Sequence, residues 1–125
     1  MPLATLLEPM KAAILVLADT ESHADLGRLT NALQAAREFQ EAGDDVVVVF
    51  DGAGTGWVPE LEDPDHPAHA LYESLTDVVR VCDYCADAFH VGDAVDESDV
   101  DRVAQFEGHP SVRELVADGY EVVTY

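Results

Sequence analysis

The sequence predicts an α/β fold, a three-layer α/β/α sandwich around a five-stranded, mostly parallel sheet. Two apolar runs, "AAILVLA" (residues 12–18) and "DVVVVF" (residues 45–50), are continuous and rich in Val and Ile, as expected of strands that are covered on both faces. Segments with helical spacing alternate with these and further strand candidates. Such alternation, with right-handed crossovers, produces helices on both faces of a parallel sheet.

The spacing of hydrophobic residues predicts the first β-α-β unit. Between the two apolar runs, hydrophobic residues recur at helical intervals, and Gly43 follows them as a helix stop. After "DGAGTG" and a loop rich in Pro and Asp, Pro67 can open a second helix. "DVVRV" (residues 77–81) then reads as the third strand. The inner faces of the two helices are Leu26, Leu29, Leu33 and Ala36, and Ala68, Leu71, Tyr72 and Leu75.

The last third of the chain predicts two more strands. "VDESDVDRV" (residues 95–103) is expected to form a short acidic helix and "AQFEG" (residues 104–108) a weak fourth strand. Ser111 and Glu114 are placed as a capping box, Gly119 stops the helix that follows, and "YEVVTY" is the final strand. With no internal repeat or linker, residues 1–125 are expected to form a single domain.

The charge is strongly acidic, with 26 Asp and Glu against 6 Lys and Arg and a formal net charge of -20. Lys11 is the only lysine, so binding to nucleic acid or to an anionic membrane surface is not expected. The acids are spread along the chain rather than gathered in a tail. Together with the small core residues they resemble the composition of halophilic archaeal proteins, and we interpret them as an adaptation to high salt.

No targeting segment is expected. "KAAILVLA" (residues 11–18) is followed at once by polar "DTESHAD" instead of a cleavage site, and no apolar run approaches the ~20 residues that span a bilayer. We therefore expect a cytoplasmic protein. In a reducing cytosol, a CxxC motif is more often catalytic, redox-active or metal-binding than a structural disulfide.

"RVCDYCADAFHVGD" (residues 80–93) contains both cysteines of the chain. Ligands gather at the carboxyl ends of parallel strands, and Cys82 would close the third strand while Cys85 enters the next helical turn. Unpaired N–H groups there favour an anion, so we expect Cys82 to be an accessible, reactive thiol. Arg80 would assist, whereas neighbouring Asp83 and Asp87 would raise the thiol pKa.

Three alternatives for the cysteines stay open. They could be inert and buried. They could cycle as a dithiol and a disulfide. They could also supply two of the four ligands of a zinc site, which His90, His109, or the pair His66 and His69 would complete. The preferred interpretation contains no metal and no cofactor.

Two other loops at the same sheet edge supply substrate-loop candidates, namely His23 in the first, and Gly52, Gly54 and Trp57 in the second. The glycine spacing matches neither a dinucleotide-binding motif nor a P-loop, so a flexible loop needing positive φ is expected. Trp57 would act as a hydrophobic lid or subunit contact. His23 could shuttle a proton to the thiol, or simply be solvated before a helix.

The order and spacing of "AAILVLADTES", "RLTNALQAAREFQEAG", "DVVVVFDGAGTGW", "VRVCDYCADAFHVG" and "SVRELVADGYEVVTY" resemble the DsrE-like sulfur-relay proteins, including the DsrE/DsrF and YchN-like branches. The resemblance implies a sandwich of flavodoxin-like appearance, sheet order 4-3-2-1-5 and assembly into homotrimers or hexamers. It places the sulfur-accepting cysteine at Cys82, with Cys85 assisting or resolving. Phe89 and His90 stand where many relatives have a basic residue and a glycine.

The sequence thus predicts a small sulfur-carrier or sulfurtransferase-like protein that forms a persulfide on Cys82, with other sulfur-relay proteins as possible partners. The alternatives are a non-catalytic binding or assembly module of the same fold, and a dithiol redox or zinc-binding protein that uses the CxxC motif.

Overall fold

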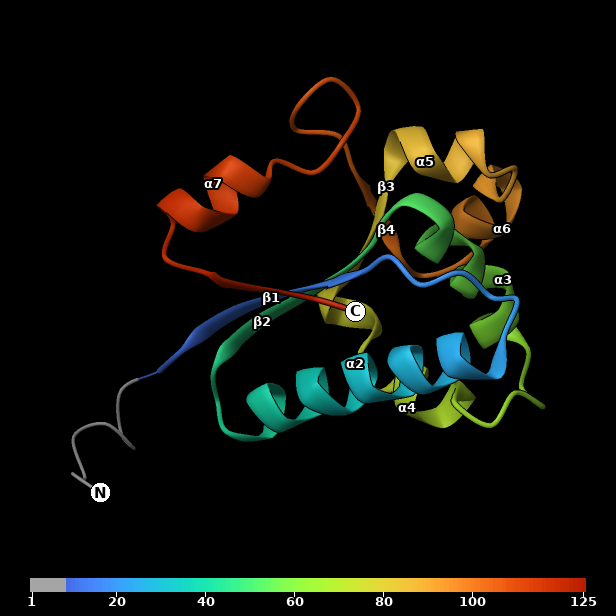
Figure 1. The fold of residues 1–125 in the computed structure, drawn as a ribbon, viewed down its shortest axis with the longest axis horizontal. Coiled ribbons are helices and arrows are strands. Elements are labelled where there is room, and N and C mark those ends of the chain that lie inside the picture. The colour runs from blue at the N-terminus through green and yellow to red at the C-terminus, as the bar shows by residue number, and fades with distance from the viewer. Residues whose placement is uncertain (1–8) are drawn as a thin grey trace.

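The computed structural model describes residues 9–125 and contains a five-stranded sheet in the order β4-β3-β2-β1-β5, with every neighbouring pair parallel (Figure 1). This confirms the predicted fold class and strand order. Residues 1–8 of the predicted domain lie outside the described residues. The strands are β1 (Lys11–Val16), β2 (Asp45–Phe50), β3 (Val79–Cys82), β4 (Asp101–Val103) and β5 (Glu121–Thr124).

Helices cover the sheet on both faces, which gives the three expected layers. The helices α2 and α4 lie on one face, and α7 lies on the other (Figure 1). Leu115 of α7 lines a cavity together with Val47 and Val49 of β2. The helices are α2 (His23–Glu41), α3 (Trp57–Glu62), α4 (His69–Glu73), α5 (Asp83–Ala88), α6 (Gly92–Glu97) and α7 (Val112–Ala117), with short 3-10 helices η1 (Gly52–Gly56) and η2 (Thr76–Val78).

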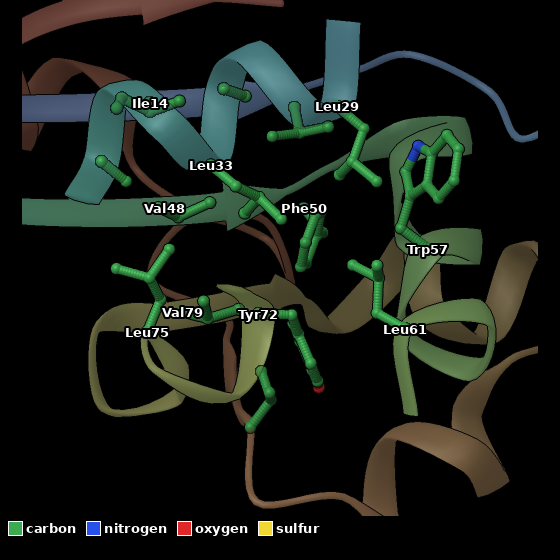
Figure 2. Packing of buried hydrophobic residues seen from close by; sticks show 14 of the residues in the cluster. Ile14, Leu29, Leu33, Val48, Phe50, Trp57, Leu61, Tyr72, Leu75 and Val79 are labelled. Atoms are coloured by element: carbon green, nitrogen blue, oxygen red, sulfur yellow. The ribbon is translucent and has the colours of Figure 1, made fainter. Parts of the chain in front are cut away.

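The main core lies between the sheet and the α2 side. Val48 of β2 is in register with Ile14 of β1 and with Val79 of β3, and all three are fully buried. Leu29 and Leu33 of α2 pack over this row (Figure 2). Burying an aliphatic side chain of this size contributes about 1.5–3 kcal/mol, so this row anchors the central strands.

Helix α2 is capped at both ends, and only one cap was predicted. Gly43 has a φ of 81°, which confirms it as the residue that ends the helix. At the start, the Ser22 hydroxyl accepts a hydrogen bond from Asp25 N at 3.1 Å, and the Asp25 carboxylate accepts one from Ser22 N at 3.3 Å. This is a complete capping box that the sequence pattern did not single out.

The predicted capping box of α7 is only half formed. The Ser111 hydroxyl accepts from Glu114 N at 3.1 Å, as expected. The reciprocal bond is not made because Ser111 N donates instead to the side-chain oxygen of Gln105 at 3.3 Å. Gln105 belongs to the connection that enters the helix, so a tertiary contact replaces the local one.

The fourth strand was predicted in the wrong place. The acidic helix ends at Glu97, and Ser98 then turns the chain by accepting a hydrogen bond from Val100 N at 3.1 Å. The strand is Asp101–Val103, which pairs with β3, whereas residues 104–108 lead into a tight turn. Val100 is 5% exposed, so burial of this valine fixes the strand start earlier than the propensity pattern suggested.

Trp57 is not a lid or a subunit contact in this chain, contrary to the prediction. It begins α3, its side chain is 3% exposed, and its indole N–H donates to the Ala18 carbonyl at 2.8 Å (Figure 2). The indole thus fills the core beside Phe50 and satisfies its one donor there.

Gly54 allows the loop after β2 to lie against the end of β1. A Cβ atom at this position would collide with the Val16 carbonyl, which already accepts a hydrogen bond from Asp51 N at 3.0 Å. The absence of a side chain at Gly54 therefore lets the loop pack against the backbone of β1, and this packing keeps Asp51 in place.

Within residues 9–125, no helix is both long and apolar enough to cross a membrane. The exposed ion pairs of α2, Arg28 with Asp25 at 3.1 Å and Arg37 with Glu41 at 3.0 Å, each contribute little to stability. With 26 acidic and 6 basic side chains, repulsion among carboxylates is the larger electrostatic effect on the surface.

Salt should therefore stabilise the protein. Screening at molar salt reduces the Debye length to about 3 Å, so we expect Tm to be about 5 °C or more higher at about 2 M KCl than at about 0.05 M. Thermal unfolding followed by circular dichroism measures this shift, and an unchanged or lower Tm at high salt would contradict it.

A glycine pair tests the packing of the loop after β2. Gly54→Ala should lower the free energy of unfolding by about 1–3 kcal/mol or more, because the added methyl group meets backbone. Gly27→Ala is the matched control, since nothing lies within 4 Å of its Cβ position in α2, and it should stabilise by about 0.5–1 kcal/mol. Equal effects of the two changes in urea denaturation would be inconsistent with this packing.

Candidate functional site

The carboxyl ends of β2 and β3 bring four metal- or proton-binding side chains together. Asp51 follows β2, Cys82 ends β3, Cys85 lies in α5, and His109 lies in the connection between β4 and α7. One ligand atom from each side chain lies within 4.8 Å of all the others. The group is made by the tertiary fold, since residues 51 and 109 are far apart in the chain.

The CxxC motif sits at a strand-to-helix junction, as the sequence predicted. Cys82 is the N-cap of α5, and its Sγ accepts a hydrogen bond from Cys85 N at 3.4 Å. Both cysteines are free thiols. Because the backbone bends at Cys82 and starts to coil at Asp83, the two sulfur atoms lie on the same side of the junction.

His109 is presented by a tight two-residue turn. Phe106 and His109 exchange both backbone hydrogen bonds at 2.9 Å, and the central residues Glu107 and Gly108 have φ values of 52° and 87°. Two successive positive φ values are typical of a type I′ turn. The turn places His109 Nδ1 at 3.4 Å from Cys82 Sγ.

The turn is tied to α5 by Tyr84. Its backbone N–H donates to the Gly108 carbonyl at 2.9 Å, and its ring lies 4.8 Å from the His109 ring at an angle of 39°. Figure 1 shows the connection before α7 reaching the carboxyl end of the sheet near α5. The imidazole is therefore held by both backbone and ring contacts.

Asp51 is held by the loop that follows β2. Its side chain accepts a hydrogen bond from Gly52 N at 2.9 Å, and Gly52 has a φ of 55°, which confirms the predicted positive φ in this loop. The loop continues as η1, which packs against α5. The carboxylate is half-buried and close enough to Cys82 to influence its ionisation.

The expectation of an accessible, easily deprotonated thiol at Cys82 is wrong for the single chain. Cys82 is 0% exposed and Cys85 8%. Burial raises the pKa of Cys82 from 9.0 to about 12; the hydrogen bond from Cys85 N opposes this, and the nearby Asp51 carboxylate adds to it. The α5 turn and the His109 turn close over the sulfur, which local sequence could not reveal.

The acids next to the cysteines, Asp83 and Asp87, form ion pairs with Arg102, and the carboxylate among the main causes of the raised Cys82 pKa is that of Asp51. The Arg102 guanidinium lies 3.1 Å from an Asp83 oxygen, 3.3 Å from Asp87 and 2.9 Å from Asp96. These carboxylates raise the pKa of Arg102. The hydrogen bonds of Arg80 are made to other groups than the cysteines. Its guanidinium donates to the Asp77 and Val79 carbonyls at 3.0 and 2.8 Å.

Of the histidines considered for the cysteines, His109 alone joins the four-residue group. His23 is the exposed first residue of α2. His66 accepts a hydrogen bond from Ala68 N at 3.0 Å, and His69 Nδ1 lies 2.6 Å from the Leu61 carbonyl. His90 is exposed at the end of α5 with a φ of 62°.

Sequence reasoning missed Asp51 and gave His109 no special weight. A signal for His109 existed, because "FEGHP" (residues 106–110) contains a glycine before a histidine, as a turn would require. Asp51 directly follows an apolar strand, at the edge where ligands gather. A thiol pair, an imidazole and a carboxylate can transfer a proton and attack an electrophile, or ligate a cation.

Comparisons with known proteins agree with this fold. The model of the DsrE/DsrF-like family matches residues 10–125, which is nearly the whole chain. An uncharacterized protein of the archaeon Methanocaldococcus jannaschii is 26% identical over 95 residues, covering 76% of this chain and 78% of the relative. No solved structure matches the chain.

Burial of Cys82 predicts a characteristic pH dependence of its reactivity. The folded state favours the neutral thiol, so this stabilisation is present below a pH of about 9 and is lost as the pH rises towards about 12. In Cys85→Ser with a chelator present, alkylation by iodoacetamide should keep rising about tenfold per pH unit from about pH 8 to about pH 10.5. The same variant in urea should level off near pH 9, and a plateau near that pH in the folded protein would contradict the burial effect.

Proposed function

Because the chain belongs to the DsrE/DsrF-like family, we propose that it is a small sulfur-carrier protein of the sulfurtransferase type. Cys82 accepts sulfane sulfur as a persulfide, and Cys85 assists or resolves it. The observation that carries this proposal is the position of His109 Nδ1, 3.4 Å from Cys82 Sγ at the carboxyl edge of the sheet.

His109 supplies the base that a buried thiol needs. With its pKa raised to about 12, Cys82 is protonated at neutral pH, and a protonated thiol is a weak nucleophile. A neutral imidazole within reach can take this proton and leave a thiolate beside an imidazolium. Asp51 lies within 4.8 Å of both groups, so its carboxylate is close to the imidazolium that this transfer forms.

The loading step transfers one sulfane sulfur atom from a donor to Cys82. The Cys82 thiolate attacks the outer sulfur of a donor persulfide, a sulfur–sulfur bond forms on Cys82, and the donor's sulfur–sulfur bond breaks. The donor leaves as a thiolate, which takes the proton from the His109 imidazolium. No external oxidant is used, because the sulfane sulfur passes between two thiols.

Cys85 offers a route for release. Its thiolate attacks the inner sulfur of the Cys82 persulfide, so that a Cys82–Cys85 disulfide forms and hydrosulfide leaves. The dithiol is oxidised by two electrons as the sulfane sulfur is reduced. The hydrogen bond from Cys85 N to Cys82 Sγ, at 3.4 Å, supports the close approach that this step requires.

The surroundings of the cysteines favour a protein as the sulfur donor or acceptor. Tyr84, Phe89 and Phe106 are 58%, 47% and 64% exposed, and all three lie on the segments that enclose the cysteines. Exposed aromatic side chains of this kind are enriched at interfaces. We infer that a relay partner, or another copy of this chain in a homo-oligomer, docks there and opens the path to Cys82.

Complete burial of Cys82 favours a second candidate, a non-catalytic binding or assembly module of the same fold. Such a module would keep the cysteines as packing residues and would not take up sulfur. Only the sulfur carrier would form a persulfide on Cys82, so this product distinguishes the two candidate functions.

Mass spectrometry after incubation with a persulfide donor separates them. We expect an adduct of about 32 Da on the native protein, its retention in Cys85→Ser, and its loss in Cys82→Ser. His109→Gln should slow adduct formation by about 10²-fold or more, because the base is removed.

His23→Gln is the matched control, since His23 is exposed and lies outside the four-residue group, and it should load at the native rate. If the native protein gains neither the adduct nor a Cys82–Cys85 disulfide, and Cys85→Ser gains no adduct, the result favours the non-catalytic module. An adduct that persists in Cys82→Ser would assign the carrier role to Cys85 instead.

A further inference from the structure

We propose that Asp51, Cys82, Cys85 and His109 form a binding site for a thiophilic divalent cation, and that Zn²⁺ is the ion they fit. This site does not depend on the proposed sulfur chemistry, although the two would compete for the same thiols. The first observation is that all four ligand atoms lie within 4.8 Å of one another.

The donor set selects the class of cation. Two sulfurs, one imidazole nitrogen and one carboxylate oxygen are the ligands that Zn²⁺ takes in four-coordinate sites. Mg²⁺ and Ca²⁺ prefer oxygen ligands throughout, so a site with two thiols discriminates against them. The CxxC spacing supplies the sulfur pair, and the fold supplies the other two ligands.

The distances are on the scale of a tetrahedral site. Zn–S bonds of about 2.3 Å and Zn–N bonds of about 2.0 Å imply ligand–ligand edges of about 3.5–3.8 Å. His109 Nδ1 and Cys82 Sγ already lie 3.4 Å apart. The widest spacing in the group, 4.8 Å at most, would contract by about 1 Å, which side-chain rotation can supply.

Each ligand side chain is held in place by a contact that still leaves it able to bind the ion. Cys82 accepts from Cys85 N, the His109 ring packs on Tyr84, and the Asp51 carboxylate accepts from Gly52 N while retaining further lone pairs. Such outer contacts orient ligands and tune their affinity. Three separate segments of the chain therefore converge on one point.

Among the described residues, Asp51 forms no ion pair that would compete with a metal ion for its carboxylate. Arg102 is committed to Asp83, Asp87 and Asp96, so it does not balance Asp51. Asp51 is therefore free to ligate the ion, while the two thiols offset the charge of the ion by losing their protons. On binding, each thiol gives up its proton to solvent and becomes a metal thiolate, so that two protons leave for each ion bound. The occupied site then has no free thiol, and bound cation would block sulfur loading.

Co²⁺ serves as the spectroscopic probe for the site on the full chain. Metal-free protein titrated with Co²⁺ should bind one equivalent and develop a thiolate-to-cobalt charge-transfer band with visible bands of a tetrahedral complex, and Zn²⁺ should displace it. Cys82→Ser and Cys85→Ser should lose or strongly weaken the charge-transfer band. His109→Ala and Asp51→Asn should each weaken Zn²⁺ affinity at least about tenfold in competition with a chromophoric chelator.

Matched controls are His23→Ala and Asp19→Asn, whose side chains are exposed near the same sheet edge and outside the group, and both should bind Zn²⁺ as the native protein does. Circular dichroism verifies that each variant is folded. Absence of the charge-transfer band in the native protein, or native affinity in folded His109→Ala and Asp51→Asn, would overturn the proposal. Either result leaves the persulfide adduct measurable by mass, so failure of the cation site and failure of the sulfur-carrier function are distinguishable.

Discussion

The parallel pairing of β2 with β3 is the constraint on which the site depends. Phe50 is in register with Val81, so the residues that follow them, Asp51 and Cys82, lie side by side where the two strands end. Both strands are fixed by buried side chains, and a slip of one residue would exchange the side chains that pack against α2 with those of the opposite face. The core therefore sets the distance between the carboxylate and the thiol, and the loops add the imidazole and the second sulfur.

Strands β1, β2, β3 and β5 and the position of the cysteines could be predicted because they depend on local pattern. Continuous Val-rich runs mark buried parallel strands, and the residue after such a run lies at the carboxyl edge of the sheet. Helix α2 is equally visible, because its apolar spacing and Gly43 are local signals. The family resemblance supplied the strand order, which the apolar pattern alone leaves open.

What could not be predicted depends on contacts between distant segments. His109 reaches Cys82 only because the Glu107–Gly108 turn is anchored on Tyr84, and the same turn helps to bury the sulfur. Trp57 enters the core because the Ala18 carbonyl accepts its N–H. Such tertiary hydrogen bonds produce no periodic pattern in the sequence. The exposure of the Cys82 thiol was therefore predicted from the position of the motif alone, and this prediction was wrong.

The contact between the His109 imidazole and the Cys82 sulfur joins the last connection of the chain to the CxxC motif, and long-range ¹H–¹⁵N NMR of the histidine rings can detect it. The chain has five histidines, so the other four serve as internal references. Replacing Cys82 with serine should shift the ring nitrogen signals of His109 while the signals of the other four histidines stay where they are. Unchanged His109 signals in a folded variant would show that the imidazole does not contact the Cys82 sulfur.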